Sequence, residues 1–346
     1  VYSYLIPVLV TALGMTLAQA GFISSVNYFA AALGGWIGGW LCDRYGRARI
    51  LQLTILWFSL FSFLSGFVPN YEQMLVVRTL QGLGFGAVWA VGAVLLGEII
   101  TPKHRGKALG TVHSGAAIGS ALAGPVAAAF DPDIGWRVVF WSGILPAVLS
   151  FFVRRGSDDS EVYKRAAQRL RETGQRRTLA AIFAPGVLKI TLLASLLSIG
   201  VQGAAYSISN YVTAFLNLER GLSVSLAGVL VMLNSAGGFF GFLTNAYVSD
   251  AVGRRKVFRL FGAGFVITAT IYLFAPLGSS AWALGLAGFV YGFFQFGMYA
   301  SFGPYFTELF PTEVRGSGQA FAYNFGRAGS AFFIMLVPLV ALSTAL

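Results

Sequence analysis

A series of apolar stretches, each about as long as a helix that crosses a bilayer, constrains this chain more than any other feature. About 20 consecutive apolar residues span the hydrocarbon core of a membrane, and short polar connections separate the stretches here. The sequence therefore predicts an all-α, polytopic membrane protein. Eleven spans are expected, of which the first is too short to cross alone, near residues 1–14, 17–41, 50–68, 73–100, 107–130, 136–153, 187–216, 223–248, 257–275, 281–307 and 317–343.

The composition excludes several other classes of protein. Of the 346 residues, 56% are hydrophobic and 11% are charged, whereas soluble domains carry about 25% charged residues. The one cysteine, Cys42, excludes an intramolecular disulfide. Two histidines leave little material for a metal site, and no cluster of carboxylates or histidines suits a membrane enzyme. We expect no catalytic residues, no metal and no cofactor.

The placement of the basic residues predicts the orientation. Their net charge of +11 would favour a nucleic-acid partner only if they shared one face, but they recur between the spans. Alternate connections hold 20 of the 24 Lys and Arg residues, and the other connections hold only Arg137 and Arg220. The positive-inside rule places the first set in the cytoplasm. We expect a monomeric, multi-pass protein of the cell membrane with no nucleic-acid partner.

A polar segment and an internal repeat organise the chain. Residues 154–185 form the one long polar stretch and divide the spans into six before and five after. The pattern Asp-x-x-Gly-Arg at Asp43 recurs at Asp250, an offset of 207, and Glu followed seven residues later by Arg-Gly recurs at Glu98 and Glu308, an offset of 210. Two related bundles of helices with a site between them are typical of alternating-access transporters. The predicted divisions are an N-terminal bundle, a cytoplasmic linker and a C-terminal bundle, at residues 1–153, 154–185 and 186–346.

The first copy of the repeat resembles the loop signature of the major facilitator superfamily, Gly-x-Leu-x-Asp-Arg-x-Gly-Arg. Gly39, Leu41, Asp43, Arg44, Gly46 and Arg47 meet it in full, and the second copy lacks its first glycine and one arginine (Ala246 and Ala251). The fourth span also meets the family pattern Arg-x-x-Gln-Gly-x-Gly at Arg78, Gln81, Gly82 and Gly84. The resemblance implies a fold of twelve helices in two bundles related by a pseudo-twofold axis. About eleven of these helices are expected here, because we expect the start of the first span and the whole of the twelfth to be missing. The termini of the full-length protein are expected in the cytoplasm.

Two further runs, residues 210–223 and 303–327, are most similar to the metabolite:proton symporter branch of that family. The resemblance implies a secondary transporter that moves a small organic anion, such as sialate, a monocarboxylate or an aromatic acid, together with protons. The alternatives are a sugar or polyol porter and a drug:proton antiporter of the same family.

Charged residues at the cytoplasmic helix ends are candidates for a gate. An aspartate there can bind arginine or a helix N-terminus only while the two bundles are closed on that side. Glu98 and Glu308 each precede an arginine by seven residues, across the turn into the next span. For Arg47, Arg49 and Lys107 we favour a role in topology alone. The residues of the expected gate are Gly39, Asp43, Arg44, Gly46, Arg47, Glu98, Arg105, Asp250, Gly253, Arg254, Glu308 and Arg315.

Glycines four residues apart let helices approach one another closely. We therefore expect helix contacts at the pairs Gly34/Gly38, Gly35/Gly39, Gly115/Gly119 and Gly237/Gly241.

Arg327 is the outstanding candidate for binding the substrate, because it lies near the centre of the last span. Its guanidinium offers a two-pronged fork to a carboxylate, and it shares a helix face with Gln319 and Tyr323. The alternative is an arginine neutralised by an internal acid. Polar residues on other spans bind substrate or join helices. The expected substrate site comprises Arg327, Tyr323, Asn324, Gln319, Gln202, Tyr206, Asn210, Asn27 and Gln295.

Proton coupling has two candidates. His113 is the one imidazole expected within a span, and its ordinary pKa of about 6.5 suits proton exchange. The alternative is a packed, hydrogen-bonded histidine. Arg78 lies in the outer half of the fourth span, where it would tune a proton-binding acid or reach the outer interface.

Overall fold

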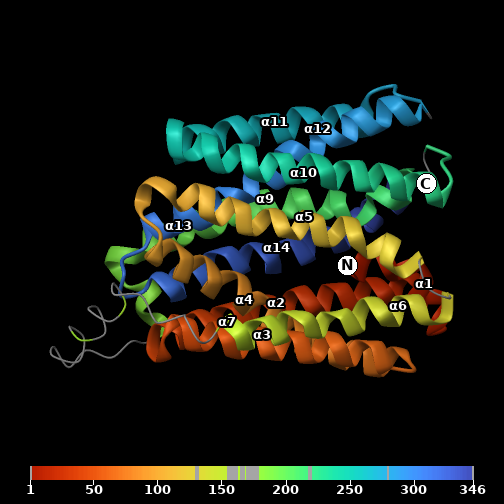
Figure 1. Ribbon diagram of the computed structural model, residues 1–346. Helices are drawn as coiled ribbons and strands as arrows, with labels where there is room; N and C mark the ends of the chain where they lie inside the picture. Colours follow the sequence, from red (N-terminus) through yellow and green to blue (C-terminus); the bar gives the residue numbers. More distant parts are fainter. Residues whose placement is uncertain are drawn as a thin grey trace. The chain divides into compact units, whose positions relative to one another are not determined.

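The computed structural model describes residues 2–128, 132–153, 163, 168, 179–216, 220–278 and 280–344. Within these residues the chain is almost entirely helical and has no strand, which confirms the all-α prediction. Each predicted span coincides with one helix or with a run of short helices (Figure 1). The helices are α1 Tyr2–Ala12, α2 Leu17–Tyr45, α3 Arg47–Leu64, α4 Tyr71–Ile99, α5 Arg105–Ala128, α6 Pro132–Trp141, α7 Leu145–Val153, α9 Pro185–Ala214, α10 Val224–Val252, α11 Arg254–Phe274, α12 Ala281–Ala300, α13 Phe302–Leu309 and α14 Arg315–Thr344.

Six helical segments of the described residues are both long and apolar enough to cross a membrane. Three further helices, α2, α5 and α14, have 29, 24 and 30 residues and so are long enough, but they are not in that set. All three contain several glycine and serine residues, and such small residues let a helix pack closely against its neighbours.

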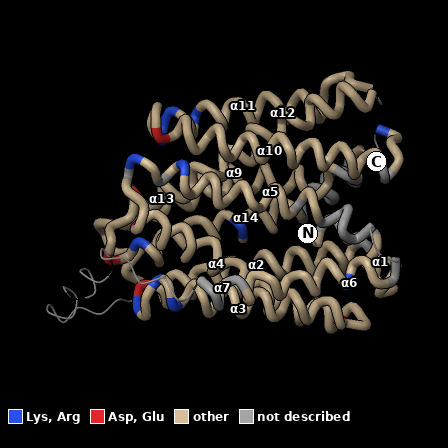
Figure 2. Tube along the Cα trace, in the orientation of Figure 1, with Lys and Arg blue, Asp and Glu red and all other residues tan. Residues whose placement is uncertain are grey.

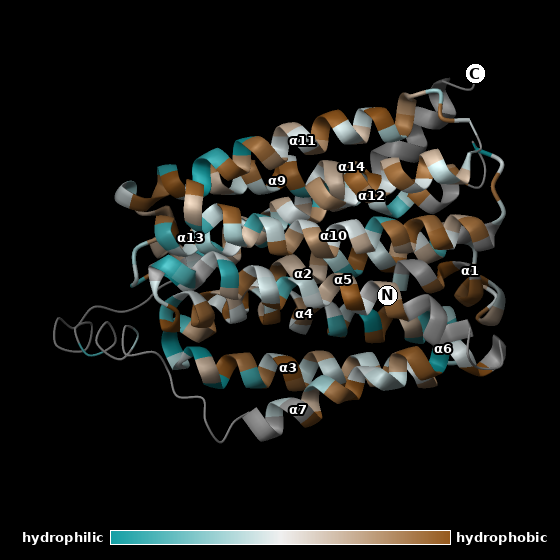
Figure 3. Cartoon of the chain, turned by 45° about the horizontal axis from the view of Figure 1, so that its top comes forward, coloured by the Kyte–Doolittle hydropathy of each residue, from teal (hydrophilic) through white to brown (hydrophobic). Residues whose placement is uncertain are grey.

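Charged residues gather at the ends of the helices. Figure 2 shows Lys, Arg, Asp and Glu mainly at helix ends, with very few charges along the helix bodies. The hydropathy colouring of Figure 3 likewise shows that hydrophilic residues are concentrated toward the ends. This distribution suits helices whose middle parts lie in hydrocarbon, where a charge is costly.

The chain forms two compact units. The α10 unit comprises Ile100–Pro125 and Ala205–Tyr305, and the α2 unit comprises Tyr2–Ile99, Val126–Ala204 and Phe306–Leu346. Each unit therefore combines segments from both sides of the predicted linker, which lies largely outside the described residues. The division of the chain at residues 153 and 185 stays a prediction.

In the α2 unit, glycines bring three helices together. A Cβ atom at Gly34 or Gly38 would collide with α4, at the carbonyl of Leu83 or at the side chain of Ala87. A Cβ at Gly35 or Gly39 would collide with α14 instead. The two overlapping glycine pairs of α2 thus serve two different neighbours.

In the α10 unit, Gly237 and Gly241 of α10 face backbone carbonyls of α12, as expected. The prediction for Gly115 and Gly119 of α5 is wrong within the described part of the chain, because a Cβ at either position would meet no described atom within 4 Å. The spacing of two glycines marks a face on which helices can approach, but a neighbour must also lie against that face.

Candidate functional site

A single glycine separates consecutive helices in each copy of the repeat. Gly46 ends α2 and precedes α3 with a φ of 108°, and Gly253 ends α10 and precedes α11 with a φ of 98°. L-residues with a side chain rarely adopt these angles. The glycine of Asp-x-x-Gly-Arg therefore makes a turn with no loop, which places the residues on both sides of it close together.

The arginine after this glycine caps the helix that precedes it. Arg47 Nη1 donates to the carbonyl oxygen of Cys42 at 3.2 Å, and Arg254 Nη1 donates to that of Ser249 at 2.7 Å. Each guanidinium also pairs with the aspartate four residues before it, Asp43 or Asp250, at 3.1 and 2.7 Å. A cation at a helix C-terminus is favourable because the last carbonyls carry partial negative charge.

Each aspartate of the repeat binds the N-terminus of a distant helix in its own unit. Asp43 accepts hydrogen bonds from the backbone N–H of Gly316 at 3.3 Å and from that of Ser317 at 2.7 Å, and the Ser317 hydroxyl donates to it at 2.7 Å. Asp250 accepts from the N–H groups of Gly106 and Lys107 at 3.1 and 3.0 Å. Asp43 thus caps α14 and Asp250 caps α5, where the unpaired N–H groups and the helix dipole favour a carboxylate.

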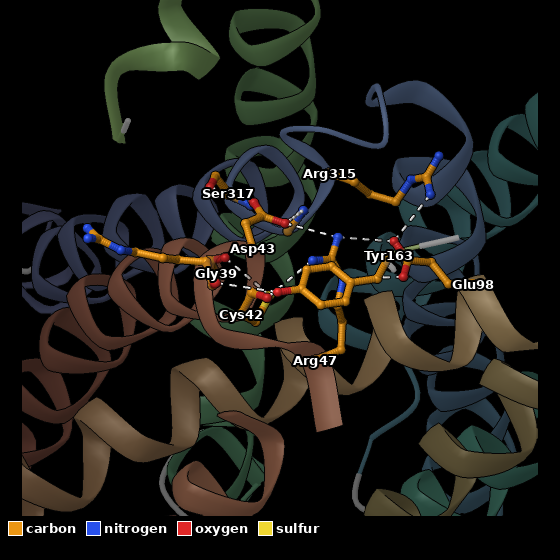
Figure 4. A network of polar contacts seen from close by, with 10 residues as sticks. Gly39, Cys42, Asp43, Arg47, Glu98, Tyr163, Arg315 and Ser317 are labelled. Atoms are coloured by element: carbon orange, nitrogen blue, oxygen red, sulfur yellow. Dashed lines mark hydrogen bonds and ion pairs between the residues drawn. The ribbon is translucent and has the colours of Figure 1, made fainter. Parts of the chain in front are cut away.

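In the α2 unit the arginine also binds a second carboxylate (Figure 4). Arg47 is 0% exposed, and its Nε and Nη2 donate to the two carboxylate oxygens of Glu98 at 3.2 and 3.3 Å. Arg315, the first residue of α14, donates to Glu98 at 3.3 Å. We call Asp43, Arg47, Glu98 and Arg315 the ion-pair network. It joins the ends of α2, α3 and α4 to the start of α14.

The interpretation that Arg47 serves topology alone is wrong, since a buried arginine with two carboxylate partners holds four helix ends. Arg44 differs from it, although both belong to the signature. Its side chain is exposed and lies near the rings of Trp40 and Tyr45, with both centroids at 5.5 Å. Because the Arg44 side chain is exposed, the second copy of the repeat can have alanine, Ala251, at the corresponding position.

A tyrosine of the linker region lies on the ion-pair network. The Tyr163 ring centroid is 4.2 Å from the guanidinium carbon of Arg47, and its hydroxyl donates to the carbonyl of Arg44 at 3.4 Å. Figure 4 shows the ring beside the guanidinium. A ring over a cation is stabilising, more so when both are shielded from water.

The arginines that contact Glu98 in the described part of the chain belong to distant segments. Among the described side chains, Glu98 pairs with Arg47 and Arg315. The side chain of Arg105 lies outside the described residues. Glu308 is exposed on α13.

The departure of the second copy from the signature has a physical counterpart. A Cβ at Gly39 would collide with the side chain of Ala320, and a Cβ at Gly110 would collide with that of Ala246. Gly39 corresponds to Ala246, and Ala320 corresponds to Gly110, in the two copies of the repeat. Each contact therefore contains one glycine and one alanine with the helices exchanged, so the same close approach needs no glycine at position 246.

We expect Gly110→Ala to destabilise the protein by about 1–3 kcal/mol, because the added methyl group has no space against Ala246. The double variant with Ala246→Gly should recover most of that loss. Gly115→Ala, on the same helix but with no described atom within 4 Å of its Cβ, is the control. Thermal unfolding in detergent measures all three, and a double variant no more stable than Gly110→Ala would contradict the exchange.

Arg327 lies farther along α14, among aromatic side chains of the α2 unit. It is 2% exposed, and its guanidinium carbon is 4.6 Å from the ring centroid of Phe85 and 4.9 Å from that of Tyr323. Its Nη1 donates to Asn324 Oδ1 at 3.1 Å, and the Asn324 amide donates to Ala320 O at 2.9 Å. The carboxamide occupies the space left by Gly35. The guanidinium is thus held in a defined place by packing and by its hydrogen bond to Asn324.

Three other predicted substrate residues of the α2 unit join helices. Gln202 of α9 donates to the carbonyl of Tyr323 at 2.7 Å. Asn27 of α2 donates to Gln81 Oε1 at 2.9 Å and to the carbonyl of Arg78. Gln319 accepts from the Thr307 hydroxyl at 3.1 Å and lies two turns, about 12 Å, before Arg327 along the helix. Of these three, Gln202 lies beside Arg327, because it binds the backbone of Tyr323, whose ring contacts the guanidinium.

The remaining predicted substrate residues lie in the α10 unit. Gln295 of α12 donates to the carbonyl of Ala205 at 3.1 Å and to the Ser209 hydroxyl at 2.7 Å. Asn210 donates to the carbonyl of Tyr206 at 2.8 Å, and the Tyr206 ring lies 6.1 Å from that of Tyr299. These side chains join α9 to α12.

The two candidates for proton coupling lie in different units. His113 of α5 is stacked on Phe242 of α10, with the ring centroids 6.1 Å apart. The guanidinium carbon of Arg78 lies 4.7 Å from the ring centroid of Tyr2 and 5.8 Å from that of Phe140. Both residues face aromatic rings, and their part in proton movement stays a prediction.

Several residues of these clusters were not predicted from the sequence. Ser317, Tyr163 and Trp89 are among them, and Trp89 is stacked on Tyr323 with the centroids 3.4 Å apart. The small residues around Trp89, which leave space beside a large indole, are the one local signal. Nothing local distinguishes Tyr163 from other tyrosines.

Comparisons with known proteins agree with these observations. The family model described as Major Facilitator Superfamily matches residues 1–334. A probable 4-methylmuconolactone transporter of Cupriavidus pinatubonensis is 43% identical over 331 residues, 94% of this chain and 76% of that protein. The cis,cis-muconate transport protein of Acinetobacter baylyi is 28% identical over 92% of this chain and 77% of its own length. The solved structure of the proton:xylose symporter XylE superposes with a TM-score of 0.80 at 17% identity, covering 99% of this chain and 85% of that one.

Proposed function

Because the chain belongs to the major facilitator superfamily, and is therefore a multi-pass membrane transporter and not an enzyme, we propose that it carries a small organic anion by alternating access, coupled to protons. The anion is a carboxylate, the ion-pair network is a gate on the cytoplasmic side of the cell membrane, and the protein acts as a monomer.

The position of Arg327 carries this proposal. A guanidinium that is 2% exposed in the body of a helix predicted to cross the membrane is costly, and such residues usually serve the transported substrate. Its planar fork matches the two oxygens of a carboxylate. The relatives named as muconolactone and muconate transporters support an organic acid as the substrate.

The gate is proposed from the geometry of the ion-pair network. Asp43 and Glu98 hold the start of α14 through two backbone N–H groups, one hydroxyl and Arg315. Breaking these bonds would release α14 from α2, α3 and α4 at this end. A network of this kind gives a two-state element a bias of a few kcal/mol, which substrate and proton binding can overcome.

Uptake by proteoliposomes tests the proposal. The labelled compounds are benzoate, cis,cis-muconate, sialate and a hexose, each with and without an inward proton gradient. We expect saturable uptake of an acid that increases with the gradient. Hexose uptake without acid uptake would contradict the proposal that the substrate is a carboxylate. Acid uptake that does not change with the gradient would contradict proton coupling.

We expect Asp43→Asn to slow net uptake about tenfold while equilibrium binding of the acid changes less than twofold. The amide loses the charge that strengthens the bonds to Ser317, Gly316 and Arg47, but none of these groups binds substrate. Glu72→Gln, an exposed change in the first turn of α4, is the control. Lost binding with an unchanged transport cycle would contradict the role of Asp43 in gating.

A further inference from the structure

Two stacked aromatic side chains, Trp89 and Tyr323, lie beside Arg327. The rings of Trp89 on α4 and Tyr323 on α14 are parallel within 14°, with their centroids 3.4 Å apart. Tyr323 is 3% exposed, whereas Trp89 is only partly buried. The tyrosine therefore supports the indole from within the protein, and part of the indole surface is still accessible.

The aromatic pair and the charge occupy consecutive turns of the same two helices. Phe85 and Trp89 are four residues apart on α4, and Tyr323 and Arg327 are four residues apart on α14. At one turn the guanidinium of Arg327 lies over the ring of Phe85. At the neighbouring turn Trp89 stacks on Tyr323. One helical turn is about 5.4 Å, so a ring or chain whose carboxylate binds the guanidinium can lie at the level of the stacked pair.

The guanidinium is fixed relative to the rings. Asn324 accepts from Arg327 Nη1 and is itself tied to the backbone of α14, and Gly35 of α2 leaves the space that the carboxamide fills. Tyr323 lies under the guanidinium as well as beside the indole. A site with a fixed cation one turn from a flat, partly exposed π surface distinguishes ligands by shape as well as by charge.

We propose that Trp89 is a specificity-determining residue, which selects planar, conjugated carboxylates over saturated acids of the same size. This inference rests on the proposed function, in which Arg327 binds the carboxylate. A flat ring or diene lies against the indole, with its carboxylate directed to the guanidinium. A saturated ring is puckered and a saturated chain is flexible, so neither makes the same contact. Stacking of aromatic groups is worth roughly a three- to tenfold difference in affinity beyond the area that it buries.

Two matched pairs of acids test this proposal by isothermal titration of the purified protein. Benzoate is compared with cyclohexanecarboxylate, and cis,cis-muconate with adipate. We expect the conjugated acid of at least one pair to bind roughly three- to tenfold more tightly than its saturated partner. Trp89→Leu should remove this ratio by weakening the conjugated acid, and Trp89→Phe should keep most of it. Trp282→Leu, at a tryptophan of α12 that is 80% exposed, is the control for loss of an indole.

The outcomes separate this inference from the proposed function. If both acids of each pair bind equally to the wild type, or if Trp89→Leu weakens both members alike, Trp89 does not select for planarity, although Arg327 can still bind carboxylates. If Trp89→Leu keeps the wild-type ratio, the selection lies elsewhere. If no acid of either pair binds and hexoses do, the proposed function fails together with the inference.

Discussion

Arg47→Met is expected to reduce net uptake by at least about 100-fold and to lower the unfolding temperature. The substitution leaves Asp43 and Glu98 buried without the cation between them. Removing one partner of a buried ion pair costs about 3–5 kcal/mol. This cost falls on the state in which α14 is bound to α2, α3 and α4, and it exceeds the few kcal/mol by which transporters of this kind are biased. The protein should therefore remain in the state that is open at this end.

The neighbouring arginine supplies a matched control for this prediction. Arg44 lies in the same signature but is exposed, so Arg44→Met should change uptake less than twofold. Arg47→Lys should be intermediate, because lysine keeps the charge but not the fork that reaches Glu98 through two nitrogens. Equal uptake by the two methionine variants in proteoliposomes would refute the role of the network.

Arg327→Gln is expected to weaken binding of the transported acid by at least about 100-fold. The glutamine removes the buried positive charge, and the attraction between a guanidinium and a carboxylate is strong where water is excluded. Arg327→Lys should lose about tenfold, because a point charge cannot form the two parallel hydrogen bonds. Isothermal titration with the acid found in the uptake assay measures both variants.

An arginine away from the proposed site controls for the loss of the guanidinium. Arg259→Lys, at an exposed position of α11, should bind the acid as the wild type does. If Arg327→Lys bound the acid with unchanged affinity, Arg327 would not be the carboxylate ligand. If it unfolded instead, Asn324→Ala, which removes the hydrogen bond to the guanidinium, should still lower the affinity by a few fold.

The spans could be predicted from the sequence because hydrophobicity and length act locally. The predicted and observed ends differ by only a few residues, as for 17–41 and α2 or 223–248 and α10. The positions of Asp43 and Asp250 near helix ends could also be predicted, and both lie in the last turn of their helices, α2 and α10. These features depend on neighbours within a few residues of one another.

The partners within the network could not be predicted, because they are far apart in the sequence. Asp43 binds an N–H group 273 residues away, and Glu98 binds Arg315 across 217 residues. Arg47 could not be distinguished from Arg44 by spacing, because the two differ in burial: Arg47 is buried and Arg44 is exposed. Trp89 was missed for the same reason, because its stacking partner lies on another helix.

The one cysteine of the chain is a natural reporter of the gate. Cys42 is 0% exposed, its Sγ donates to the carbonyl of Gly39 at 3.1 Å, and a Cβ at Gly316 would lie 2.7 Å from that sulfur. The thiol is therefore covered by α14 when Asp43 is bound to Ser317. A group covered in one state reacts in proportion to the population of the other.

The most direct measurement is the rate at which a membrane-impermeant maleimide labels Cys42. The maleimide is added on the side of the membrane where the ion-pair network lies, and labelling is followed by mass spectrometry. We predict slow labelling in the resting protein and labelling at least about tenfold faster with the transported acid. Arg47→Met should be labelled fast with or without the acid. A rate that neither the acid nor Arg47→Met changes would contradict the claim that the ion-pair network opens during transport.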